Sequence, residues 1–217
     1  MVRVHSCSEV GGHRLNEDAF RVQAHPLAAD CWLCLVADGQ GGQAGGGAAA
    51  RLACQAALDA ALGCRPERLI DPAAWSGILR RADAAVAADS GAGFTTLVGL
   101  GVYRGRVAGA SSGDSAALVV SGGKAQELTA DQQKNPPVGS GAAVVVPFAA
   151  AVTEPWRVLV LSDGVWKYVG WDRVVEVASR APGPAVIAEL QESARLPGSG
   201  RFHDDFTVVV LEAAATG

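Results

Sequence analysis

Two segments of the chain share one pattern, in which an apolar run ends in a single carboxylate and then opens into glycine. The first spans residues 35–43 and centres on Asp38-Gly39, and the second spans residues 158–164 and centres on Asp163-Gly164. Runs of this kind are typical of strands, and a following glycine lets the backbone approach a bound group closely. A carboxylate placed there is suited to receive a hard cation, and the glycines also suit a phosphate. We therefore expect Asp38 and Asp163 to belong to one site.

Length and composition limit the classes of protein to which the chain can belong. The 217 residues suffice for one sizeable core, so we expect a single domain over 1–217. The net charge of −4, without a basic run, argues against a nucleic-acid partner. The first residues lack the apolar core of a signal peptide, and no apolar stretch reaches the roughly 18 residues needed to span a bilayer. These features predict a cytoplasmic monomer that does not contact a membrane.

The cysteines give no sign of a disulfide framework. There are five, an odd number without regular spacing, which suits reduced thiols in a reducing compartment. Cys31 and Cys34 form an isolated CxxC, a weak signal for zinc or redox chemistry. Since residues three apart on a strand point to opposite faces, we interpret them as separate buried thiols.

Apolar periodicity and turn residues predict the order of the elements. The expected strands are 1–11, 19–23, 31–37, 94–103, 106–111, 116–120, 157–161 and 207–212, and the expected helices are 47–62, 72–89, 172–180 and 184–195. The three strands between 94 and 120 are expected to form an antiparallel meander. Residues 129–155 are expected to be an irregular, flap-like region of the kind that often serves as a lid or specificity element.

Acidic side chains stand at the ends of four strand-like segments. They are Glu17-Asp18, Asp38, Asp163 and Asp204-Asp205. Neighbouring residues on an extended chain point to opposite sides, so at most one of Glu17 and Asp18 is expected to bind a given ion directly. If the strand ends converge, the carboxylates repel one another unless divalent cations hold them together, and an all-oxygen set selects Mg²⁺ or Mn²⁺ over zinc. Two such ions could activate a shared water and clamp a phosphoryl group.

Five motifs give the chain a resemblance to a known family over nearly its whole length. In order they are Asn16-Glu17-Asp18-Ala19, Val36-Ala37-Asp38-Gly39-Gln40-Gly41-Gly42, Thr95-Thr96 ahead of Gly113-Asp114-Ser115, Ser162-Asp163-Gly164, and Asp204-Asp205-Phe206-Thr207 with the valines that follow. The chain resembles the bacterial metal-dependent protein serine/threonine phosphatases of the protein phosphatase 2C (PPM) type. The resemblance implies an α+β fold, a four-layer α-β-β-α sandwich of two antiparallel sheets flanked by helices, with a binuclear metal centre at one end.

The resemblance also implies a ligand set for two Mn²⁺ or Mg²⁺ ions. Asp38 would bridge both ions. The backbone carbonyl of Gly39 and the side chain of Glu17 would bind the second ion. Asp163 and Asp204 would bind the first.

The implied reaction is direct attack of a metal-activated water on phosphorus, without a phosphoenzyme. Asp18 would hold a metal-bound water. The family usually places a phosphate-binding arginine four residues before the glutamate, where this chain has His13, followed by Arg14. Because arginine binds phosphate bidentately and histidine does not, either phosphate binding is weaker here or Arg14 takes the role.

Two further departures concern a third metal site and the flap. Many members use the Asp of Gly-Asp-Ser, here Asp114, together with an Asp at the position that Lys167 occupies in this chain. The ammonium could mimic the cation, pair with Asp114 or leave the site empty. The segment 129–163 is also shorter than the usual bacterial flap subdomain, so substrate selection by a flap stays open.

The motifs favour hydrolysis of phosphoserine or phosphothreonine in proteins. The expected partner is a phosphorylated protein substrate, such as a Ser/Thr kinase or its target. The alternative is a pseudophosphatase, a regulatory module that binds a partner or metal without turnover, which His13 and Lys167 favour. An intact set of costly acids speaks against it. A third interpretation, in which the acids are only turn residues of a generic sandwich, does not account for five motifs in order.

Overall fold

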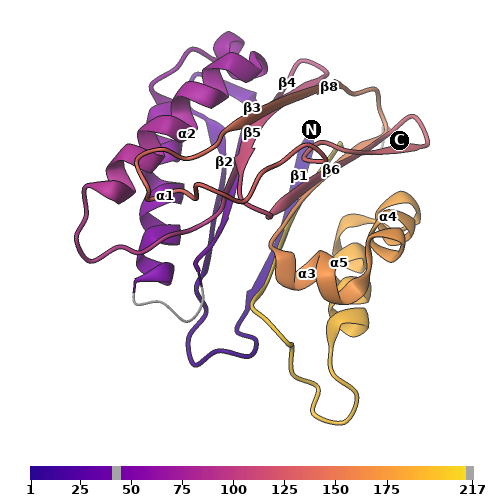
Figure 1. The fold of residues 1–217 in the computed structure, drawn as a ribbon. Coiled ribbons are helices and arrows are strands. Elements are labelled where there is room, and N and C mark those ends of the chain that lie inside the picture. The colour runs from indigo at the N-terminus through magenta and orange to yellow at the C-terminus, as the bar shows by residue number, and fades with distance from the viewer. Residues whose placement is uncertain (41–44, 214–217) are drawn as a thin grey trace.

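The computed structural model describes residues 1–40 and 45–213. It consists of two five-stranded antiparallel sheets packed face to face, with helices on both outer faces, as Figure 1 shows. This arrangement confirms the predicted α+β sandwich. The glycine-rich stretch that follows Asp38 lies partly outside the described residues, because 41–44 are not among them.

The strand order of each sheet joins segments that are far apart in sequence. The first sheet, called the β10 sheet here, has the order β1 (Val2–Glu9), β10 (Phe206–Ala213), β9 (Trp156–Leu161), β6 (Ala116–Ser121) and β7 (Lys124–Glu127). The second, the β3 sheet, has the order β2 (Asp18–His25), β3 (Ala28–Asp38), β4 (Leu97–Tyr103), β5 (Arg106–Ser112) and β8 (Val146–Ala151).

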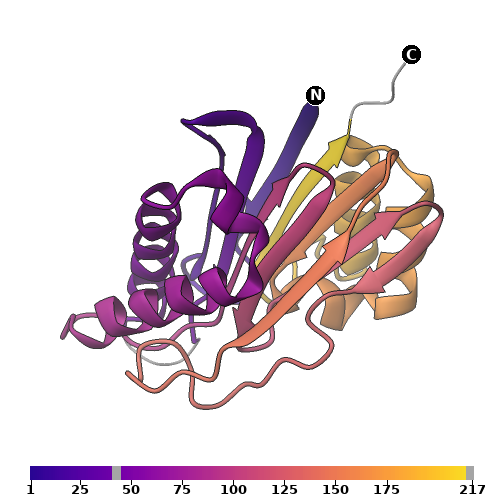
Figure 2. The same ribbon diagram turned by 90° about the horizontal axis from the view of Figure 1, so that it is seen from above.

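The helices divide between the two outer faces (Figures 1 and 2). The β3 sheet is covered by α1 (Gly46–Leu62), the short 3₁₀ helix η1 (Pro66–Ile70) and α2 (Pro72–Ala87). The β10 sheet is covered by α3 (Asp163–Val169), α4 (Trp171–Arg180) and α5 (Gly183–Ala194). Asp71 caps α2 by accepting the N–H of Ala73 at 3.0 Å, with Pro72 at the first helical position. None of the helices in the described parts of the chain is long and apolar enough to span a bilayer.

Apolar side chains form one layer between the sheets and one layer under each group of helices. Cys31 belongs to the layer under α1 and α2, and Cys34 belongs to the layer between the sheets, which confirms that the two thiols lie on opposite faces of β3. Gly99 of β4 makes room for Trp75, since a Cβ at this position would lie 2.9 Å from the Trp75 ring. Helix α2 can therefore sit close to the sheet.

The predicted meander is wrong in its third strand. Strands β4 and β5 do pair, but β6 belongs to the other sheet and pairs with β9 and β7. The chain changes sheet at residues 113–115, where Gly113 has a φ of 100°, a left-handed conformation that glycine adopts without strain. Hydrophobic alternation is the same in either sheet, so the sequence pattern does not reveal this crossing.

Other elements depart from the predicted order in smaller ways. Residues 146–151, expected to lie within an irregular region, form the edge strand β8 against β5. Helix α3 starts at Asp163, where the sequence predicted no helix, and the short elements η1 and β7 were not predicted. All of these are short or begin with turn-forming residues, for which periodicity gives little signal.

Candidate functional site

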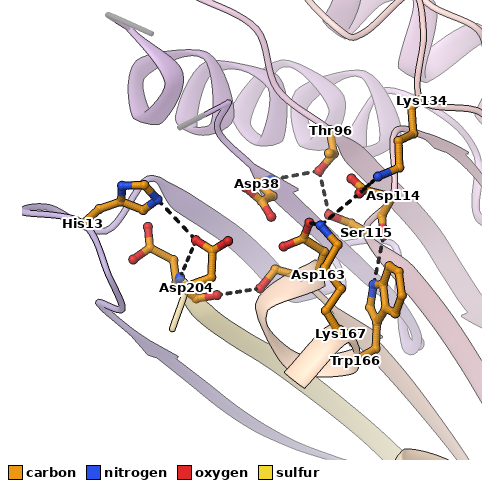
Figure 3. A network of polar contacts seen from close by, with 12 residues as sticks. His13, Asp38, Thr96, Asp114, Ser115, Lys134, Asp163, Trp166, Lys167 and Asp204 are labelled. Atoms are coloured by element: carbon orange, nitrogen blue, oxygen red, sulfur yellow. Dashed lines mark hydrogen bonds and ion pairs between the residues drawn. The ribbon is translucent and has the colours of Figure 1, made fainter. Parts of the chain in front are cut away.

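A cavity of about 350 Å³ opens at one end of the sandwich. Five aspartates line it, namely Asp38, Asp114, Asp163, Asp204 and Asp205. They come from different places in the fold: the end of β3, the crossing between the sheets, the start of α3 and the segment before β10. The convergence that the sequence predicted for Asp38, Asp163 and Asp204 is therefore present, and Figure 3 shows these side chains facing one another.

Backbone hydrogen bonds hold Asp38 at the end of β3. Its N–H donates to the hydroxyl of Thr96 at 2.9 Å, and its carbonyl accepts the N–H of Thr96 at 2.9 Å. The next residue, Gly39, donates its N–H to the carbonyl of Glu17 at 3.2 Å, and a Cβ at Gly39 would lie 2.4 Å from the backbone of Gly46. Glycine is thus required for the chain to pass between β2 and α1.

The other side of the cavity depends on close packing between α3 and the 204–205 segment. A Cβ at Gly164 would lie 2.0 Å from the carbonyl oxygen of Asp205. The carboxylate of Asp205 accepts the N–H groups of Gly11 at 2.8 Å and Glu17 at 2.6 Å. Asp205 therefore fixes the turn between β1 and β2, while its neighbour Asp204 faces the cavity.

Asp18 is buried beside Asp38, its partner in the register of β2 and β3. Within the described residues, neither of its carboxylate oxygens accepts a hydrogen bond. Burial raises the pKa of Asp18, and the carboxylates of Asp205 and Asp163 add to the effect. The nearby hydroxyls of Thr207 and Ser162 oppose this shift, but neither forms a hydrogen bond with Asp18 in the structure. A buried carboxyl group with two unpartnered oxygens calls for a hydrogen-bond donor or a cation.

The electrostatics of the cavity also indicate a shortage of positive charge. Burial raises the pKa of Asp38 far above its ordinary value, and the carboxylates of Asp18, Asp163 and Asp204 raise it further. Burial raises the pKa of Asp163 as well, although Lys167 opposes the effect. Carboxylates that share a site cannot all ionise without cations between them.

Two lysines supply part of the missing charge. The ammonium of Lys167 contacts Asp163 and lies 3.6 Å from Asp114, and that of Lys134 lies 2.5 Å from Asp114 (Figure 3). Although burial opposes it, these two ammonium groups hold the pKa of Asp114 below its ordinary value. Asp114 is thus neutralised by the protein itself, whereas Asp38 is not.

The remaining predicted site residues differ in position. His13 lines the cavity, with its Nε2 3.3 Å from an oxygen of Asp204. The side chains of Arg14 and Glu17 are not among those lining the cavity in the described part of the chain, and Arg14 is exposed. The Cβ of Glu17 instead lies at the start of α1, near Gly47.

The donor set fits Mg²⁺ or Mn²⁺ in chemistry, because it consists of carboxylate and carbonyl oxygens with excess negative charge. Although Asp38, Asp163 and Asp204 line one cavity, over residues 1–40 and 45–213 no three acidic, histidine or cysteine side chains lie close enough together to form a ready metal site. The ammonium of Lys167 contacts one of these carboxylates, that of Asp163.

Sequence reasoning did not identify every residue that shapes the site. Lys134 lies in a polar, proline-containing loop, where an isolated lysine gives no signal. Thr96, whose hydroxyl also bonds that of Ser115 at 2.6 Å, belongs to one of the five motifs, but the motif alone assigns it no role. Trp166 donates its ring N–H to the carbonyl of Asp114 at 3.0 Å, a contact that only the fold reveals.

Comparisons with known proteins agree on the fold. The model of the family described as Stage II sporulation protein E (SpoIIE) matches residues 22–214, which begin just after the first of the five motifs. No curated protein sequence matches the chain.

Several solved structures are similar over nearly their full length. The catalytic domain of the serine threonine protein phosphatase PstP, in complex with two manganese ions, has a TM-score of 0.79 at 22% identity, covering 97% of both chains. PppA of Pseudomonas aeruginosa has a TM-score of 0.73 at 24% identity, and the match covers 98% of both chains. The serine/threonine phosphatase Stp1 from Staphylococcus aureus gives 0.76 at 16% identity, covering 99% of this chain and 96% of the other. At these identities the likeness establishes the fold.

Proposed function

The chain belongs to the Stage II sporulation protein E (SpoIIE) family, and from this premise we propose that it is a metal-dependent phosphatase that hydrolyses phosphoserine or phosphothreonine in proteins. Family and fold together confirm the resemblance to the protein phosphatase 2C (PPM) type. The observation that carries the proposed activity is the cavity at the end of the sandwich, where Asp38, Asp163 and Asp204 meet without enough positive charge.

In this proposal two Mn²⁺ or Mg²⁺ ions bind at the cavity, held by Asp38, Asp163, Asp204, Glu17 and the carbonyl of Gly39. When bound, such ions lower the pKa of a water and neutralise the oxygens of a phosphoryl group. The PstP catalytic domain, similar in fold, is described with two manganese ions, which supports the number. For Glu17 to take part, its side chain must turn from the start of α1 toward the cavity.

The protein's own groups have separate tasks in this reaction. Asp18, with two buried oxygens that lack partners, holds and orients a water beside Asp38. His13 lies at the cavity wall and contacts the substrate's phosphate, whereas Arg14 lies outside it. No serine or cysteine nucleophile is needed, because the water attacks phosphorus directly.

The lysines argue for two ions and against a third. Asp114, the acid that a third ion would use, already pairs with Lys134 and Lys167. An ammonium at this place provides one positive charge without a metal. The expected substrate is a phosphorylated protein, such as a Ser/Thr kinase or its target, and we expect the protein to be a monomer in the cytoplasm.

The test is hydrolysis of p-nitrophenyl phosphate and of a phosphothreonine peptide, with Mn²⁺ and with a chelator. We expect activity only with metal, and a loss of roughly a hundredfold or more in Asp38→Ala, since metal-bound activation of water contributes several kcal/mol. Asp59→Ala, an exposed change on α1, is the matched control. Full activity in Asp38→Ala, or in chelator, would contradict the proposal. Manganese binding without turnover would instead identify a binding module.

A further inference from the structure

The segment 129–145, which links β7 to β8, forms one wall of the cavity. It passes along α2 in Figure 2, and its residues Lys134, Asn135 and Pro137 line the cavity together with the aspartates. Thr95 pairs with Val138 of this segment through two backbone hydrogen bonds of 3.0 and 3.1 Å. Thr95 also bridges to Gly39, so the segment is connected through one residue to the Asp38 motif.

A single buried carboxylate fixes the other half of the segment. Asp83 of α2 is 4% exposed, and its Oδ1 accepts the N–H groups of Gly139 at 2.8 Å and Gly141 at 3.1 Å. Its Oδ2 accepts the N–H of Ala143 at 3.1 Å. Gly139 and Gly141 have φ values of 103° and 73°, so glycine allows the loop to curl around the carboxylate. Charged acceptors form strong hydrogen bonds, so Asp83 holds the loop firmly to α2.

Lys134 is the part of this wall that carries charge. Its side chain is 61% exposed, while that of its partner Asp114 is 14% exposed. Asp114 also faces Lys167, so Lys134 can leave without stranding a buried carboxylate. An ammonium has three donors, and the single carboxylate contact leaves the others for a second anion.

We propose that segment 129–145 is the substrate-binding wall of this site, with Lys134 contacting a phosphate oxygen of the bound phosphoprotein and Asp83 acting as the positioning residue that places Lys134. The inference rests on the proposed phosphatase function. It assigns to this short segment a role in recognition. It also explains why a buried acid far from the catalytic aspartates in sequence accepts the backbone N–H groups of Gly139, Gly141 and Ala143.

Steady-state kinetics of Lys134→Met, Lys134→Arg and the control Lys124→Met test the contact with phosphate. Lys124 is an exposed lysine of β7 outside the cavity. For both p-nitrophenyl phosphate and a phosphothreonine peptide, we expect Lys134→Met to raise KM about tenfold, the size of one exposed charged hydrogen bond, with kcat changing less than about threefold. Lys134→Arg should restore KM to within about threefold, and Lys124→Met should match the natural chain.

Hydrogen exchange on the metal-free protein tests the role of Asp83 without relying on activity. In Asp83→Ala, and to a smaller extent in Asp83→Asn, the amides of Gly139, Gly141 and Ala143 should exchange about tenfold faster or more, because each loses a charged acceptor. Asp89→Asn, an exposed acid just after α2, should leave them unchanged. Asp83→Asn should also raise KM for the peptide while kcat stays within about threefold.

The two hypotheses fail in different ways. If the natural chain shows no metal-dependent turnover of either substrate, the proposed function fails. The proposed contact of Lys134 with phosphate is tested only if the natural chain hydrolyses both substrates. It is wrong if Lys134→Met then leaves both KM values unchanged, or changes the KM of the peptide alone. Unchanged amide exchange in Asp83→Ala, in protein shown to be folded, would overturn the positioning role.

Discussion

Replacing Asp38 by asparagine is expected to stabilise the metal-free protein while it weakens metal binding. The reason is that this aspartate is buried among other carboxylates, which raise its pKa. Asparagine has the same shape and no charge, and the backbone N–H of residue 38 keeps its bond to Thr96. The substitution therefore removes repulsion without opening a cavity.

The expected gain in stability can be worked out from the proton that the Asp38 carboxyl binds in the folded chain. In the folded protein the raised pKa keeps Asp38 neutral at pH 7, whereas in the unfolded chain it titrates near 3.8. Holding that proton over about three pH units costs at most about 4 kcal/mol, at roughly 1.4 kcal/mol per unit. Water in the open cavity relieves part of this, so we expect a gain of about 2 kcal/mol, or roughly 4–8 °C in Tm for a chain of this size.

The assay is thermal unfolding of the natural chain and of Asp38→Asn, in chelator and in Mn²⁺, with Asp59→Asn as control. A folded chain with a raised carboxyl pKa binds more protons than the unfolded one, so Asp38 costs the natural chain more stability as pH rises from about 4 toward 7. The difference in stability between Asp38→Asn and the natural chain should therefore be near zero at about pH 4 and increase toward pH 7. Mn²⁺ at a hundred times its Kd should stabilise the natural chain by about 2.7 kcal/mol, so that the natural chain then unfolds at a higher temperature than Asp38→Asn.

A variant that is less stable than the natural chain in chelator at pH 7 would refute the reasoning. So would an advantage that is as large at pH 4 as at pH 7, because repulsion between carboxylates would then not be its cause.

Three further changes test the packing around the site and the fold. Glu212→Ala should lower the free energy of unfolding by about 3–5 kcal/mol in a urea titration, because it leaves the mostly buried guanidinium of Arg157, 2.7 Å away, without its partner. Gly164→Ala should weaken Mn²⁺ binding in calorimetry by about tenfold or more, because its Cβ would meet the carbonyl of Asp205 at 2.0 Å and push the 204–205 segment away. Asp71→Ala should cost about 1 kcal/mol in the same urea titration through the loss of a helix cap. The first prediction is wrong if Glu212→Ala changes the free energy of unfolding by less than about 0.3 kcal/mol. The second is wrong if Gly164→Ala leaves the Mn²⁺ affinity unaltered, and the third if Asp71→Ala leaves the stability unaltered.

The sequence was sufficient for those features that depend on local pattern. An apolar strand that ends in Asp-Gly identified Asp38 and Asp163 as cavity residues, and apolar periodicity identified helix α2. The position of acidic residues at strand ends also predicted that Asp38, Asp163 and Asp204 converge, and in the sandwich these three side chains line one cavity.

What the sequence could not predict depends on contacts between distant segments. Asp83 looks like any polar residue of an amphipathic helix until the loop at 139–143 folds over it. Lys134 is recognised as a site residue only through its contact with Asp114. The position of Asp114 depends in turn on the crossing of the chain between the two sheets. Side-chain alternation fixes which face of a strand is buried and carries no information about which sheet receives the strand.

The division of the acids between the two sheets has a consequence for how the protein acquires its function. Asp38 ends a strand of the β3 sheet, whereas Asp163 and Asp204 adjoin strands of the β10 sheet. Neither sheet alone brings these three side chains together, so the proposed metal centre exists only where the two sheets pack against each other. The packing that completes the core also brings the negative charges together, so a divalent ion bound there would offset part of the free energy that this repulsion costs.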